Sequence, residues 1–115
     1  MPSGEVHKIF YRMAGLDDVE AARLQYFIDG ASQDPRLGPR HRSVNHTLGD
    51  FIPYLITHVK KGRNAKGRFV SREAKAMQLT AAFMSHVLLD SVAKDARTKA
   101  MLELLPALQK AIRAS

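Results

Sequence analysis

Cysteine is absent from the 115-residue sequence, and this absence excludes two kinds of site at once. Neither a disulfide framework nor a thiolate zinc site can form, so a bound metal ion would need histidine, aspartate or glutamate ligands. A chain of this length can bury one hydrophobic core without such cross-links. We therefore expect a single domain over residues 1–115, in a reducing compartment.

Long apolar segments are also lacking. The longest stretch with almost no charge, residues 76–89, contains His86 and is shorter than the roughly 20 apolar residues of a membrane-spanning helix. Residues 1–5 show no basic region followed by an apolar run, as a secretion signal would. We expect a cytoplasmic protein with no transmembrane segment.

Acidic residues are scarce relative to basic ones. The sequence has 11 Asp and Glu residues and 18 Lys and Arg residues, which gives a net charge of +7. Such a surface attracts polyanions such as nucleic acid, phospholipid headgroups or an acidic protein. Residues 60–68 read as an exposed basic loop without aromatic residues, so binding there would involve backbone phosphates rather than bases. Its candidate polyanion-binding residues are Lys60, Lys61, Arg63, Lys66 and Arg68.

Helix-forming residues are abundant, aromatic residues are few, and the alternation typical of strands is nearly absent. The sequence predicts an all-α, single-domain bundle of four to five helices. Ser3 is expected to cap a first helix that ends at about Ala14, before Gly15. Asp17 and Glu20 form a capping-box pattern at the start of a second helix.

A third helical segment is predicted over residues 44–61. Gly49 and Pro53 suggest a break within it, and Asp50 is the expected cap of the restart. The segment is therefore predicted as one helix or two shorter pieces.

Ser71 is expected to cap the longest helix, residues 72–93, which should be central because apolar residues lie on several of its sides. A last helix from about Asp95 should bend or divide at Pro106, and its Met- and Leu-rich faces are candidates for oligomerisation. The apolar residues of the longest helix are Met77, Ala81, Met84 and Leu88 on one side and Leu79, Ala82 and Phe83 on another.

His86 and Asp90 are the most informative pair in the sequence. They lie four residues apart on a helix that is apolar almost all round, so they share one face and should point inward. Because burial of an unpaired carboxylate is costly, Asp90 needs a cation, a hydrogen-bonding histidine or a metal ion nearby. Two explanations stay open: a metal-binding or catalytic pair, or a buried hydrogen bond that only fixes helix packing.

Further histidines could complete a site around this pair. His41 and His46 flank residues 42–45 at a loop-to-helix junction, where side chains converge on sites held by rigid elements. Imidazoles and carboxylates together form the ligand set of zinc, with manganese or iron as the alternatives. His58 is a weaker candidate, because a solvated histidine near a helix end needs no ligand.

These motifs resemble a known family. Predicted metal-dependent hydrolases of the bacterial and archaeal membrane-bound type, distantly similar to zinc phospholipase C, carry an early His, an Asp-containing loop, a His-Arg-x-x-Thr-His-Ser motif and a later Ser-His-Leu-x-x-Asp. This sequence has His7 near its start, Asp34 in the loop, His-Arg-Ser-Val-Asn-His-Thr at residues 41–47 and Ser-His-Val-Leu-Leu-Asp at residues 85–90. The family's membrane helices are lacking here.

The resemblance implies a divalent metal on a helical scaffold, with catalytic roles for Asp34 and Arg42. A bound ion would activate a water molecule while Arg40 or Arg42 steadies a phosphate oxygen, which gives hydrolysis of a phosphate-bearing substrate. The implied metal ligands are His7, His41, His46, His86 and Asp90.

The alternative is a non-enzymatic basic helical protein. The basic loop at residues 60–68, together with Arg36, Arg40 and Arg42, would then bind nucleic acid or act in an assembly.

Overall fold

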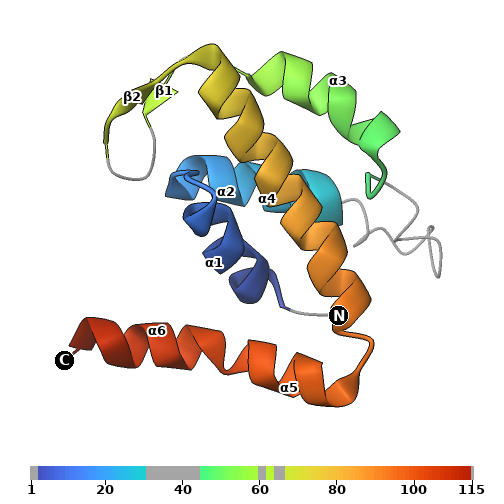
Figure 1. Ribbon diagram of the computed structural model, residues 1–115, viewed down its shortest axis with the longest axis vertical. Coiled ribbons are helices and arrows are strands. Elements are labelled where there is room, and N and C mark those ends of the chain that lie inside the picture. The colour runs from blue at the N-terminus through green and yellow to red at the C-terminus, as the bar shows by residue number, and fades with distance from the viewer. Residues whose placement is uncertain (1–2, 31–44, 60–61, 64–66, 115) are drawn as a thin grey trace.

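Helices make up nearly all the regular structure of this chain (Figure 1). The computed structural model describes residues 3–30, 45–59, 62–63 and 67–114. The predicted all-α fold with a long central helix is confirmed. The elements are α1 (Gly4–Met13), α2 (Asp18–Gln25), the π-helical turn η1 (Tyr26–Gly30), α3 (Leu48–His58), the paired two-residue strands β1 (Gly62–Arg63) and β2 (Phe69–Val70), α4 (Arg72–Val92), α5 (Ala96–Glu103) and α6 (Leu105–Ala114).

Side-chain caps start the helices where the sequence predicts them. The Ser3 hydroxyl accepts a backbone hydrogen bond at the start of α1, and the Ser71 hydroxyl does the same at the start of α4. At the start of α2, Asp17 Oδ1 accepts the N–H of Glu20 (2.7 Å) and Glu20 Oε1 accepts the N–H of Asp17 (3.3 Å), which completes the capping box. Gly15 has a φ of 108°, a conformation that favours glycine.

The predicted details of α3 are partly wrong. Thr47 is the cap, because its Oγ1 accepts the N–H of Asp50 (3.3 Å), so Asp50 lies inside the first turn. Pro53 removes only one N–H from the helical ladder, and α3 continues through it to His58. Pro106 does divide the last predicted helix: it lies in the first turn of α6, where no helical N–H is needed.

The core forms where α4 crosses the N-terminal helices and α3 (Figure 1). α4 contacts α1 on one side and α3 on another, and α1 packs against α2. Phe51 of α3 stacks on Phe83 of α4 with ring centroids 4.3 Å apart. The core residues are Tyr11, Leu16, Ala21, Leu24, Ile28, Phe51, Tyr54, Leu79, Ala82 and Phe83.

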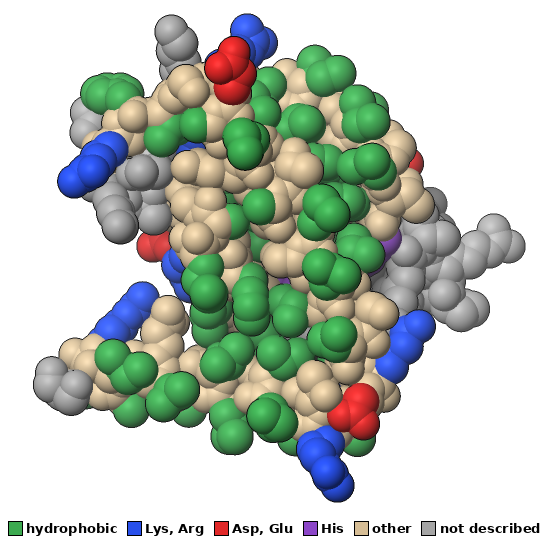
Figure 2. Space-filling model, viewed as in Figure 1, with side chains coloured by type: hydrophobic (Ala, Val, Ile, Leu, Met, Phe, Trp, Pro, Cys, Tyr) green, Lys and Arg blue, Asp and Glu red, His purple; other side chains and the backbone are tan. Residues whose placement is uncertain are grey.

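The outward face of α4 departs from the prediction. Leu79, Ala82 and Phe83 are buried as expected. The other predicted apolar side is exposed, because no described helix covers it. This side consists of Met77, Ala81, Met84 and Leu88. Figure 2 shows hydrophobic side chains along this face and down to α5 and α6, which bury no residue of their own. No described helix is both long and apolar enough to span a bilayer.

Lys75 is a buried charge that the sequence did not reveal. Its side chain is 1 % exposed, and Nζ lies 2.9 Å from Glu20 Oε1. Glu20 thus serves the α2 cap and the ion pair together. Buried charges in this fold are matched by a close partner, as the cost of their dehydration requires.

Truncation of the aromatic stack tests this core. Phe51→Ala is expected to lower the free energy of unfolding by about 3–5 kcal/mol, because it leaves a cavity beside Phe83. Phe69→Ala is the matched control: Phe69 is 76 % exposed, and its loss is expected to change stability by less than about 0.5 kcal/mol. Urea denaturation followed by circular dichroism measures both, and equal effects would contradict the assigned core.

Candidate metal centre

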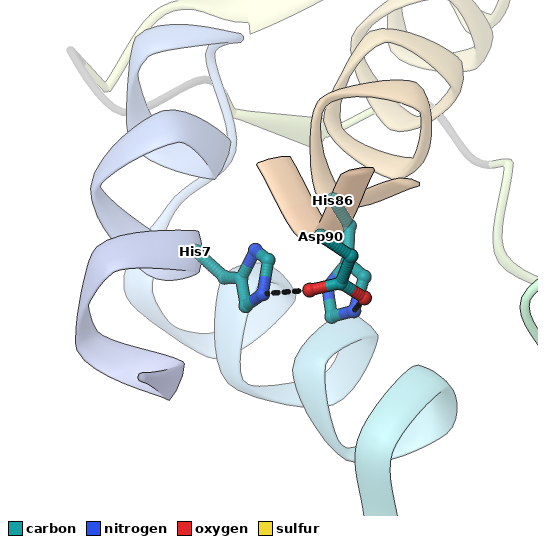
Figure 3. A group of neighbouring side chains, drawn as sticks. All are labelled: His7, His86 and Asp90. Atoms are coloured by element: carbon teal, nitrogen blue, oxygen red, sulfur yellow. Dashed lines mark hydrogen bonds and ion pairs between the residues drawn. The ribbon is translucent and has the colours of Figure 1, made fainter. Parts of the chain in front are cut away.

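Five ionisable side chains from four parts of the fold meet in the interior. His7 comes from α1, Asp29 from η1, His46 from the residues just before α3, and His86 and Asp90 from α4. His7 and His86 are fully buried and Asp90 is 6 % exposed. Figure 3 shows His7 facing Asp90 and His86 across the space between α1 and α4.

Four of these side chains bring one nitrogen or oxygen atom each close to its neighbours in the cluster. His86 Nε2 lies 3.2 Å from Asp90 Oδ2 and 3.4 Å from Asp29 Oδ1. His46 Nε2 lies 3.3 Å from Asp29 Oδ1 and 3.6 Å from Asp90 Oδ2. In a tetrahedral zinc site with bonds of about 2.0–2.1 Å, the ligand atoms are about 3.3–3.4 Å apart. The four nitrogen–oxygen separations, 3.2–3.6 Å, are therefore close to those between zinc ligands.

Two atoms of this set lack a hydrogen bond within the described residues. They are Nε2 of His86 and Oδ2 of Asp90, and both are inaccessible to solvent. A buried polar atom without a hydrogen bond is costly, and coordination of an ion is one way in which proteins remove that cost. The groups Asp29, His46 and His86, and His7, His86 and Asp90, could each hold a metal ion.

His7 acts on the other oxygen of the same carboxylate. Its Nε2 lies 3.1 Å from Asp90 Oδ1, and because a carboxylate only accepts, His7 donates this hydrogen bond. The His7 ring also stacks on the His86 ring with centroids 3.6 Å apart. His7 thus fixes the orientation of Asp90 and of His86 together.

The two carboxyl groups are held in their charged form. Burial alone would raise the pKa of Asp90, but its interactions with His7 and His86 outweigh burial and hold the pKa well below its ordinary value. Burial likewise opposes ionisation of Asp29, and its interactions with His46 and His86 lower its pKa by more. The interior of the fold therefore contains two carboxylates at neutral pH.

The two buried histidines differ in their response to this charge. Burial lowers the pKa of His7 and outweighs its hydrogen bond to Asp90, so His7 stays neutral. Burial also opposes protonation of His86, but the adjacent carboxylates of Asp29 and Asp90 raise its pKa above the ordinary value. For His86, unlike His7, the effect of the carboxylates on the pKa outweighs the effect of burial.

Local structure places the ligands that do not lie on α4. The π-helical turn η1 ends α2 with Asp29 turned inward, and Gln25 Nε2 donates to Asp29 Oδ2 (2.7 Å). Asn45 has a φ of 59°, a left-handed conformation that asparagine tolerates. Its Nδ2 donates to the carbonyl of Phe27 (2.8 Å), which ties the residue before His46 to η1.

The structure brings together four residues that the sequence singled out: His7, His46, His86 and Asp90. Asp29 was missed. Its signal in the sequence is weak, since it consists of one carboxylate directly after the apolar pair at residues 27–28.

Other predicted site residues lie elsewhere or outside the described part of the chain. His58 packs against the Tyr54 ring with centroids 4.2 Å apart and belongs to neither metal-capable group. Arg68 is exposed beside β2, and only the backbone of Arg63 is described. The predicted residues Asp34, His41, Arg42, Lys60, Lys61 and Lys66 are outside the described residues.

Comparison with known proteins adds no assignment. No protein-family model, no curated protein and no solved structure matches this chain. The resemblance to metal-dependent hydrolases therefore stays a prediction.

The lowered carboxyl pKa values predict loss of stability in acid. A group whose pKa is lower in the folded state stabilises the fold above its unfolded-state pKa, near 3.8, and loses that contribution as the pH falls. With a chelator present, the free energy of unfolding is expected to fall from about pH 5 to about pH 2. Asp90→Asn should make this fall shallower. Urea titrations at each pH measure the slopes, and identical slopes in the two proteins would contradict the assignment.

Proposed function

We propose that this protein binds a single divalent metal ion, zinc in preference to others, through Asp29, His46, His86 and Asp90. The observation that carries the proposal is the arrangement of two nitrogen and two oxygen atoms from these residues, with close separations of 3.2–3.6 Å. Two imidazoles and two carboxylates are ligands that zinc accepts in tetrahedral geometry. His7 would orient Asp90 from outside the ligand set.

Charge balance supports an ion over a hydrogen-bonded cluster alone. Asp29 and Asp90 bring two negative charges into a buried space where their closest ionisable partners are imidazoles. One proton on His86 Nε2 cannot satisfy both carboxylates, whose nearest oxygens lie 3.4 Å (Asp29) and 3.2 Å (Asp90) from it. A divalent cation would neutralise both carboxylates and leave the imidazoles neutral, as metal binding requires.

A surface pocket lies next to Asp29. A pocket of about 270 Å³ is lined by Lys8, Gln25, Tyr26, Asp29 and neighbouring residues. Lys8 places a positive charge at this pocket, and its Nζ pairs with Glu5 Oε1 at 3.0 Å. Because Glu5 offsets the charge of Lys8, attraction of an anionic substrate such as a phosphoester to this side would depend on a bound divalent ion.

Phosphoester hydrolysis is the activity that we propose for this centre, on the strength of the sequence resemblance. A divalent ion held by these four ligands would have to accept a water molecule as a fifth ligand, and that water, with its pKa lowered, would be the nucleophile. Lys8 would lie beside the phosphate at the pocket, and His7 would keep Asp90 in place. Asp34 and Arg42 are the proposed catalytic groups.

Metal binding is tested on protein purified without a histidine tag. Elemental analysis and titration calorimetry are expected to show one zinc ion per chain. His46→Gln is expected to weaken zinc binding by at least about 100-fold, because loss of a ligand exceeds the 10- to 100-fold typical of an outer partner. His58→Gln is the matched control, since His58 also belongs to the α3 region but lies outside the cluster.

The same proteins, loaded with zinc, are then assayed on an aryl phosphodiester. Wild type and His58→Gln should hydrolyse it at equal rates, and His46→Gln should not. Absence of zinc from wild type, or equal affinity of the His46 and His58 variants, would contradict the proposed site and favour the basic, non-enzymatic alternative. Zinc binding without hydrolysis would contradict only the proposed activity.

A further inference from the structure

A chain of hydrogen bonds behind the proposed ligands connects two of them through residues that contact no ion. Asp29 Oδ2 accepts from Gln25 Nε2 (2.7 Å), Gln25 Oε1 accepts from the Tyr11 hydroxyl (2.8 Å), and the Tyr11 oxygen lies 2.6 Å from His86 Nδ1. Tyr11 is fully buried, so water does not compete for its hydroxyl group. The chain starts at one carboxylate and ends at the imidazole that faces it.

The chemistry of the groups fixes the direction of each hydrogen bond. A carboxylate can only accept, so Gln25 presents its NH₂ to Asp29 and its carbonyl oxygen to Tyr11. Tyr11 must then use its single O–H proton on Gln25. Its oxygen is left as an acceptor, and His86 Nδ1 must be the donor. The proton of a neutral His86 therefore lies on Nδ1.

We infer that Tyr11 and Gln25 are positioning residues that hold His86 in the tautomer required for metal binding. With the proton on Nδ1, the lone pair of the ring is on Nε2, the atom that faces Asp29 and Asp90. An outer partner that fixes the tautomer of a metal-binding histidine is a general feature of such sites. The inference rests on the proposed metal site and adds which residues prepare it.

Two further contacts make the arrangement rigid. The His86 ring stacks on His7, so a rotation of the imidazole would break the stack and the hydrogen bond to Tyr11 together. Gln25 also donates a hydrogen bond to Oδ2 of Asp29, and the other oxygen of that carboxylate, Oδ1, lies beside His86 and His46. One tyrosine hydroxyl thus organises a nitrogen ligand directly and an oxygen ligand through Gln25.

Removal of this hydroxyl tests the inference. Tyr11→Phe is expected to weaken zinc binding by about 10- to 100-fold, because His86 Nδ1–H loses its acceptor and the ring its fixed tautomer. Tyr54→Phe is the matched control, since Tyr54 is a core tyrosine that contacts Phe27, Phe51 and His58 but not the cluster. Its zinc affinity should equal that of wild type. Equal affinities of wild type and Tyr11→Phe would overturn the inference.

A spectroscopic readout separates this role from a general loss of packing. In ¹⁵N NMR spectra of wild type, His86 Nδ1 should carry a slowly exchanging proton, both with zinc and without it. Tyr11→Phe should lose the slow exchange, and Tyr54→Phe should keep it. An unprotonated Nδ1 in wild type would overturn the inference even if no variant folds. Because the metal-free spectrum also reports this proton, failure of zinc binding in wild type would contradict the proposed function separately.

Discussion

Two carboxylates share one buried space in this protein, and the rest of the structure is arranged around their charge. Asp29 and Asp90 come from η1 and α4, and each lies within 3.6 Å of the same two imidazole nitrogens. Uncompensated, such a pair would take up protons or unfold the chain. His7 donates a hydrogen bond to Asp90, Gln25 donates one to Asp29, and Tyr11 donates one to Gln25.

The helical scaffold holds these groups at fixed positions. α1 supplies both His7 and Tyr11, four residues apart on the face that packs against α4, so one helix orients Asp90 and His86 together. The stack of Phe51 on Phe83 fixes α3 against α4, five residues after His46 in the chain. Lys75 and Glu20 show the same rule at a second place, where a buried charge again has a close partner. Charge compensation is thus built into the contacts between helices.

The sequence predicted those features that depend on local chemistry. Caps at Ser3, Asp17 and Ser71 start helices where hydroxyl or carboxylate groups meet free N–H groups within one turn. The pairing of His86 with Asp90 follows from their spacing on α4. Such signals need only a few neighbouring residues, so a single sequence carries them.

Features that depend on contacts between distant segments could not be predicted. Asp29 joins the site because a π-helical turn ends α2 beside α4, and no local pattern indicates this turn. His7 was predicted as a ligand, but the sequence could not show that its Nε2 would lie 3.1 Å from Asp90 Oδ1. The exposed side of α4 was expected to be buried, because apolar spacing alone does not say which faces find a partner.

Crystals grown with zinc, with diffraction data collected on both sides of the zinc absorption edge, would reveal the proposed site directly. The site predicts one anomalous peak in the interior, about 2.0–2.2 Å from Nε2 of His46, Nε2 of His86 and one oxygen each of Asp29 and Asp90. A peak only at the protein surface, or an interior in which hydrogen bonds alone join these four side chains at saturating zinc, would contradict it.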